Sequence, residues 1–88
     1  MKVLIFYRPN SEHSRLVEDF MHEFGRLYPG TGLDVLSVDT VDGAREAELY
    51  DVVSYPTVIA RSDEGATLQR WDSGQMPLMN EVAYYANQ

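Results

Sequence analysis

The chain has 88 residues, a formal net charge of -7 at pH 7 and no cysteine. Its length is enough for one domain with a modest core, and its apolar content of 44% is ordinary for a soluble globular protein. A strongly negative chain is repelled by phosphate backbones and anionic lipid surfaces, so we expect no nucleic-acid and no membrane partner. The absence of cysteine excludes disulfides, cysteine–zinc sites and a cysteine nucleophile.

The N-terminal segment is an apolar run over Lys2–Tyr7 that ends at the turn-forming cluster Arg8-Pro9-Asn10. This run is too short for the core of a signal peptide or for a membrane span. Because it is almost entirely apolar, it is typical of a central strand that is covered on both faces. We therefore expect a buried first strand in a cytoplasmic protein.

A helix is predicted next, from about Glu12 to Tyr28. Its apolar residues recur at the spacing of one buried stripe. They are Leu16, Val17, Phe20, Met21, Phe24, Leu27 and Tyr28. The cluster Pro29-Gly30-Thr31-Gly32 then ends the helix.

Five more elements follow, separated by clusters rich in glycine, proline, aspartate and serine. In chain order they are a strand over Leu33–Val38, a helix over Val41–Tyr50, strands over Thr57–Arg61 and Ala66–Asp72, and a helix over Pro77–Ala86. Gly43 weakens the helix that contains it. Pro77 is expected in the first turn of the last helix, with Leu78, Val82 and Tyr85 on one face.

The order β-α-β-α-β-β-α predicts an α/β fold in one domain over residues 1–88. Two strands joined through a helix are parallel, with a right-handed crossover. The last two strands are joined by Asp63-Glu64-Gly65, a hairpin signal, so they are expected to be antiparallel. The sheet is therefore mixed and four-stranded, with helices on both faces.

Two segments carry a resemblance to a known family. Ser11-Glu12-His13-Ser14 follows the first strand, and Tyr55-Pro56-Thr57 comes directly before the third. At these places the thioredoxin-like superfamily has Cys-x-x-Cys and an apolar or aromatic residue followed by Pro-Thr. The chain resembles that superfamily over essentially its whole length, and its short length and Tyr-Arg-Pro-Asn lead-in are similar to the glutaredoxin-like branch.

The resemblance implies a minimal thioredoxin fold in which Pro56 is in the cis form and faces the loop of Ser11 and Ser14. Both cysteine positions of the motif are serine in this chain, a Ser-x-x-Ser. Thiol–disulfide exchange needs a thiolate and a second thiol, and a serine hydroxyl supplies neither. Ile5 and Asn10 stand where thioredoxins proper have a buried aspartate and a tryptophan. Glutaredoxin-like members also lack that aspartate and that tryptophan.

Arg8 lies beside the expected helix N-terminus and is a candidate anion site, for which the resemblance implies a glutathione-like tripeptide. The alternative is a solvated loop arginine. Around Pro56 the resemblance implies a groove where an extended peptide pairs with backbone, the alternative being that Pro56 only shapes the turn. The candidate binding residues are Arg8, Asn10, Ser11, His13, Tyr55, Pro56 and Thr57.

Simpler structural roles are expected for several of these residues. Asn10 or Ser11 is a good N-cap for the first helix, and Glu12 suits its first turn. A hydrolytic pair of Ser11 and His13 lacks a third residue to orient the histidine, so His13 is expected to be exposed. No metal site and no cofactor are expected, because His22 has no partner at helical spacing beyond nearby glutamates.

Two functions remain open. The first is a redox-inactive binding module that holds a peptide or protein partner in the groove beside Pro56. The second is a thiol–disulfide oxidoreductase whose two active-site cysteines were replaced by Ser11 and Ser14.

Overall fold

The structure is a computed structural model that describes residues 1–86. Its elements are β1 (Lys2–Tyr7), α1 (Ser14–Leu27), β2 (Gly32–Ser37), α2 (Val41–Leu49), β3 (Thr57–Arg61), β4 (Thr67–Trp71) and α3 (Met79–Ala86). The strand order is β2-β1-β3-β4. β1 is parallel to β2 and antiparallel to β3, which is antiparallel to β4. The predicted α/β class, the mixed sheet and all seven elements are thus confirmed.

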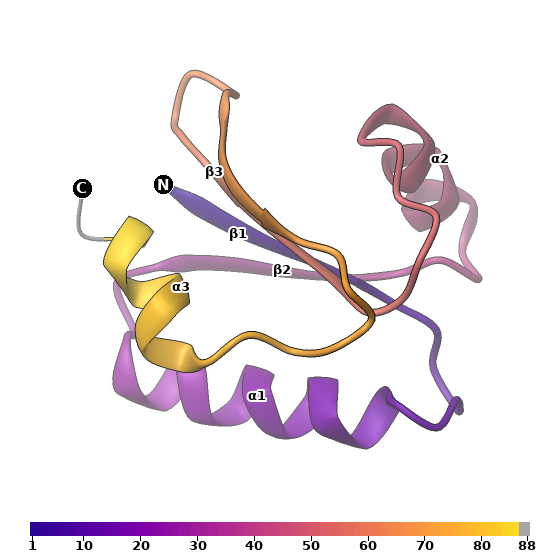
Figure 1. The fold of residues 1–88 in the computed structure, drawn as a ribbon, viewed down its shortest axis with the longest axis horizontal. Coiled ribbons are helices and arrows are strands. Elements are labelled where there is room, and N and C mark those ends of the chain that lie inside the picture. The colour runs from indigo at the N-terminus through magenta and orange to yellow at the C-terminus, as the bar shows by residue number, and fades with distance from the viewer. Residues whose placement is uncertain (87–88) are drawn as a thin grey trace.

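The helices form two unequal layers on the sheet. In Figure 1, α1 and α3 lie on one face and α2 lies on the other. β1 is central and supplies both layers, since Val3 and Ile5 face α1 whereas Leu4 and Phe6 face α2. This alternation is the period of two of a β-strand, and it explains why β1 reads as a continuous apolar run.

Each layer has its own buried core. The larger core, under α1 and α3, adds Val17, Phe20, Phe24, Val58, Val82 and Ala83 to the residues of β1. The smaller core, under α2, adds Val38, Ala47, Val52 and Ile59. The sheet is therefore held mainly from the α1 side.

The buried stripe of α1 is narrower than predicted. Val17, Phe20 and Phe24 are buried against the sheet, but Leu16 is 63% exposed and Leu27 is 47% exposed. Leu16 borders an open cavity beside the helix, and Leu27 is the last residue of α1, so little of the fold covers either side chain. The expectation that Leu16 and Leu27 belong to the core is wrong.

α3 begins two residues later than predicted. Pro77 precedes the helix, and the backbone N–H of Leu78 donates to Glu81 Oε1 at 3.2 Å while Glu81 N–H donates back to the Leu78 carbonyl at 3.1 Å. This reciprocal cap places Leu78 at the helix boundary, where it is 67% exposed. Val82 is buried as expected, but Leu78 does not share its environment. Among the helices that the structure describes, none combines the length and apolar character that crossing a membrane requires.

Candidate functional site

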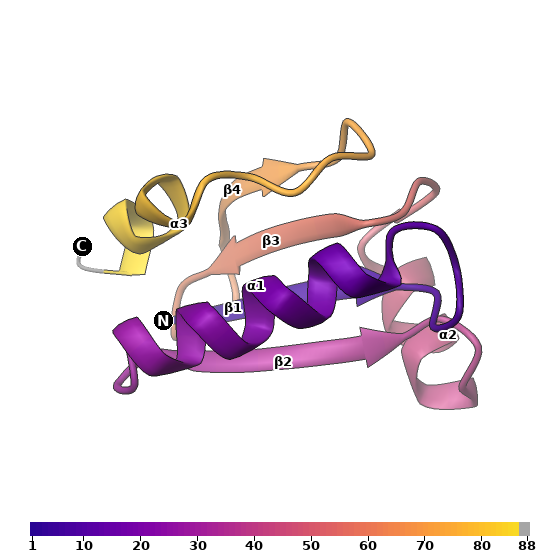
Figure 2. The same cartoon turned by 90° about the horizontal axis from the view of Figure 1, so that it is seen from below.

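Three loops meet at one end of the sheet. They are residues 8–13 after β1, residues 53–56 before β3 and residues 72–76 after β4. The antiparallel register pairs Phe6 with Thr57, so the end of β1 lies beside the start of β3. Figures 1 and 2 both place the three loops at this end, which we call the loop end of the sheet.

Side-chain contacts connect the three loops. The hydroxyl of Ser54 donates to the carbonyl oxygen of Asp72 at 2.8 Å. The guanidinium carbon of Arg8 lies 5.6 Å from the ring centroid of Tyr55, a cation–π contact. The same guanidinium lies 3.3 Å from a carboxylate oxygen of Asp39, with both side chains more than half exposed. Two of the predicted binding residues, Arg8 and Tyr55, are therefore in contact.

The loop of the two serines is held by its own hydrogen bonds. Ser11 Oγ donates to the Arg8 carbonyl at 2.5 Å, and Ser14 Oγ donates to the Ser11 carbonyl at 2.9 Å. α1 begins at Ser14 with His13 as its N-cap, and no side chain makes a capping hydrogen bond there. Asn10 has a φ of 62° and is exposed, so it serves a left-handed turn. The expectation that Asn10 or Ser11 caps the helix is wrong.

Ser11 and His13 lie close together, but not as a nucleophile and its base. Ser11 Oγ is 3.2 Å from Nδ1 and 3.1 Å from Nε2 of His13. An oxygen nearly equidistant from both ring nitrogens lies on the lone-pair axis of neither. The serine proton is also directed at the Arg8 carbonyl, and Arg8 N–H donates to His13 Nε2 at 3.2 Å. This arrangement fixes the loop and does not activate the hydroxyl.

His13 is half-buried, which contradicts the expected exposed histidine. Its ring packs edge-on against Tyr7, with centroids 6.5 Å apart. The loop therefore folds the histidine back onto the end of β1, where backbone and aromatic contacts replace solvent.

The segment before β3 presents free backbone groups beside the ring of Tyr55. The Tyr55–Pro56 peptide bond is cis. Pro56 and Thr57 are fully buried, and Thr57 Oγ1 donates to the Ser54 carbonyl at 2.7 Å. Tyr55 is half-buried, and within residues 1–86 neither its N–H nor its C=O takes part in a hydrogen bond. A backbone donor and acceptor without a protein partner is free to pair with a ligand.

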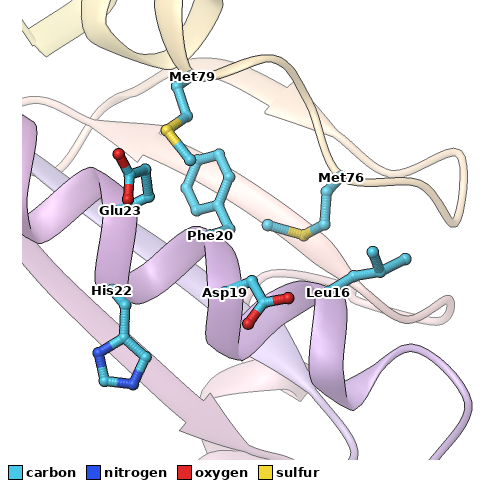
Figure 3. A pocket seen from close by; sticks show the side chains of 7 residues that line it. All are labelled: Leu16, Asp19, Phe20, His22, Glu23, Met76 and Met79. Carbon is cyan, nitrogen blue, oxygen red and sulfur yellow. The ribbon is translucent and has the colours of Figure 1, made fainter.

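A cavity of about 520 Å³ lies between α1 and the segment that leads into α3. Figure 3 shows Met76, just before α3, and Met79, its first residue, facing Phe20 across the cavity, with Leu16 at one end. Its acidic residues are Asp19 and Glu23, whereas His22 turns its ring away. The hydrogen bond from the guanidinium of Arg26 lowers the pKa of the Glu23 carboxyl.

Sequence reasoning did not find this cavity, because methionines are usually assigned to core filling. The available signal was the pair Met76 and Met79, which lies on either side of Pro77 and Leu78 at the start of the predicted last helix. Within residues 1–86, no three His, Asp or Glu side chains are grouped so that they could hold a metal ion.

No family model matches the sequence, and neither does any curated protein. Solved structures do match. Thioredoxin-2 of the malaria parasite has a TM-score of 0.80 at 20% identity, over 98% of this chain and 81% of that one. Thioredoxin of Fasciola hepatica gives 0.74 at 16%, over 97% and 76%, and thioredoxin 1 of Thermosipho africanus gives 0.72 at 16%, over 99% and 91%. The chain has a thioredoxin-like fold.

At identities of 16–20%, the likeness to these structures establishes the fold alone. The expected likeness to the glutaredoxin-like branch stays a prediction. So does the equivalence of Ser11 and Ser14 to the two redox cysteines of the superfamily.

Proposed function

We propose that this thioredoxin-like protein is redox-inactive and holds an extended segment of a peptide or protein at the loop end of the sheet, in the cytoplasm. The chain contains no cysteine. Without a thiolate, no mixed disulfide forms at Ser11, and without a second thiol none is resolved at Ser14. Holding a partner is then the role that remains for this part of the fold.

The observation that carries the proposal is the unpaired backbone of Tyr55. Its N–H and C=O have no hydrogen-bond partner within residues 1–86, although only Pro56 separates the residue from β3. An extended peptide can satisfy both groups at once, as an added strand does. Val53, which is 88% exposed, provides apolar surface on the same loop. The contact with Arg8 orders the Tyr55 ring beside it.

A glutathione-like tripeptide at Arg8 stays a prediction. Its carboxylate would have to compete with Asp39, which already lies 3.3 Å from the guanidinium. A longer peptide does not depend on that ion pair, because it pairs with backbone. We therefore favour the peptide.

The first test is selection of binding octapeptides from a random display library, followed by titration of each into ¹⁵N-labelled protein. We expect the Tyr55 amide signal to shift and Tyr55→Ala to weaken binding by about tenfold, as for loss of a buried aromatic contact. Tyr84→Ala removes an exposed tyrosine of α3 and is the matched control, with unchanged affinity expected. Selected peptides that bind Tyr55→Ala normally and leave the Tyr55 amide unmoved would contradict the proposal.

The alternative, an oxidoreductase with replaced cysteines, is examined in the same series by Ser11→Cys combined with Ser14→Cys. A folded double variant that reduces insulin disulfides over many turnovers favours the alternative. A folded but inactive one favours the binding module. The single variant Ser14→Cys is the control, since one thiol cannot complete the cycle.

A further inference from the structure

A second cavity lies between β4 and α3. Its volume is about 350 Å³. β4 is an edge strand of the sheet, and Figure 2 shows α3 beside it. The lining residues are Gln69 and Trp71 of β4 and Asn80, Glu81, Tyr84 and Tyr85 of α3.

Three aromatic rings form walls of this cavity at steep angles to one another. The rings of Trp71 and Tyr85 have centroids 5.7 Å apart and an interplanar angle of 73°. Those of Tyr84 and Tyr85 are 5.1 Å apart at 88°. Gln69 Nε2 donates to the Tyr85 hydroxyl at 3.1 Å, which holds the middle ring in place. A guest in the cavity therefore meets aromatic surface on more than one side.

The charges around these rings all favour a positive guest. The face of an aromatic ring is the negative side of its quadrupole, and it attracts cations. Glu81 adds a carboxylate, of which Oε1 accepts the N–H of Leu78. Among the described residues that line the cavity, none carries a positive charge. The chain as a whole has a net charge of -7, which raises the local concentration of cations.

We propose that the cavity between β4 and α3 binds an alkylated ammonium group. Methyl groups on the nitrogen lower the free-energy cost of removing water from the cation, and they make van der Waals contact with the rings. A bare ammonium would instead have to give up strongly held water. The two sources of such a group are a trimethylated lysine side chain and a small quaternary amine. The site is independent of the peptide-binding site proposed at Tyr55.

Trp71 is the only tryptophan of the chain, so tryptophan fluorescence reports on a wall of this cavity. The intact protein is titrated with tetramethylammonium chloride and, separately, with tert-butanol, a neutral molecule of similar shape, at constant chloride concentration. We expect saturable quenching by tetramethylammonium, with an affinity about tenfold higher than for tert-butanol. Equal responses to both, or no response to either, overturn the proposal.

Variants then separate the rings from the carboxylate. Tyr84→Leu removes an aromatic wall at a residue that is 62% exposed, and Glu81→Gln removes the charge while keeping an oxygen for the N–H of Leu78. Each is expected to weaken tetramethylammonium binding at least threefold, whereas Glu64→Gln, at the exposed tip of the hairpin, leaves it unchanged. Folded Tyr84→Leu and Glu81→Gln proteins that both bind normally overturn the assignment.

Two peptides decide whether the ammonium group belongs to a modified lysine or to a small free amine. They are acetyl-Gly-Lys-Gly-amide and its trimethyl-lysine counterpart. Tighter binding of the methylated peptide than of tetramethylammonium assigns the site to a modified side chain. Weaker binding of that peptide, with tetramethylammonium still bound, assigns it to a small free amine. Where the methylated peptide binds, equal affinity for the unmethylated one overturns the proposal, because the methyl groups and the rings would then contribute nothing.

Discussion

Gly43 lies in the first turn of α2, where a methyl group in place of its hydrogen would overlap the backbone carbonyl oxygen of Ser37. Its N–H donates to Thr40 Oγ1, the N-cap of the helix, at 2.9 Å. By helix propensity alone, glycine here weakens α2. In the fold it is the residue that lets the helix approach the end of β2.

At the scale of this residue, we expect Gly43→Ala to lower the free energy of unfolding by roughly 1–3 kcal/mol, because the backbone must shift to admit the methyl group. Gly25→Ala in α1 is the matched control: nothing lies within 4 Å of its added Cβ, and the residue is exposed. That variant should be more stable by roughly 0.5–1 kcal/mol. Urea denaturation followed by circular dichroism measures both. A stabilised Gly43→Ala would show that α2 is not packed as described.

At the scale of the element, α2 ends in a complete Schellman motif. Val52 N–H donates to the Ala47 carbonyl at 2.8 Å, and Asp51 N–H donates to that of Glu48 at 3.2 Å. Asp51, with φ at 54°, takes the left-handed position that is usually glycine. Arg70 reaches over from β4 and donates to the Asp51 carbonyl at 2.8 Å. The end of α2 is thus tied to the edge of the sheet through backbone acceptors.

We predict that Asp51→Gly stabilises the protein by up to about 1 kcal/mol. Glycine avoids a left-handed penalty of roughly 1–2 kcal/mol, and the greater freedom of the unfolded chain offsets part of that gain. The substitution also removes a negative charge from the negative end of the helix. Asp51→Asn, which removes only the charge, should gain less. Thermal and urea unfolding of the three proteins rank them, and a destabilised Asp51→Gly would refute the account of this helix end.

At the scale of the whole molecule, the chain has 14 acidic and 7 basic residues other than histidine. Lys2 with Asp34 at 2.9 Å and Arg70 with Asp72 at 2.9 Å are ion pairs whose side chains are partly exposed. Such pairs contribute about 0–1 kcal/mol each. Repulsion among the remaining carboxylates therefore dominates the surface electrostatics of the folded state.

Screening this repulsion should stabilise the fold. Between 10 mM and 300 mM sodium chloride the Debye length falls from about 30 Å to well under 10 Å. We expect Tm to rise by about 2–4 °C, equivalent to roughly 0.5 kcal/mol. Glu64→Lys at the exposed hairpin tip makes the net charge less negative and should reduce the gain. A Tm that falls with salt would mean that the ion pairs outweigh the repulsion.

The sequence by itself determined the helices and strands, and it excluded thiol–disulfide chemistry. β1 and β3 have the predicted bounds because their apolar runs are buried on both faces and end at turn-forming residues. The lack of cysteine is likewise a property of composition. Only tertiary structure decided what surrounds each side chain: that His13 folds back onto Tyr7 and Ser11, and that Pro56 is buried.

The two cavities described above also depend on tertiary structure and could not be predicted from the sequence. Trp71 and Tyr84 are far apart in the chain, and neither has a local pattern that predicts a shared cavity. Their meeting depends on where α3 lies against the edge strand. Local preferences follow from neighbours in sequence, whereas a binding site requires side chains from separate elements at fixed distances, and only packing of the whole chain sets those distances.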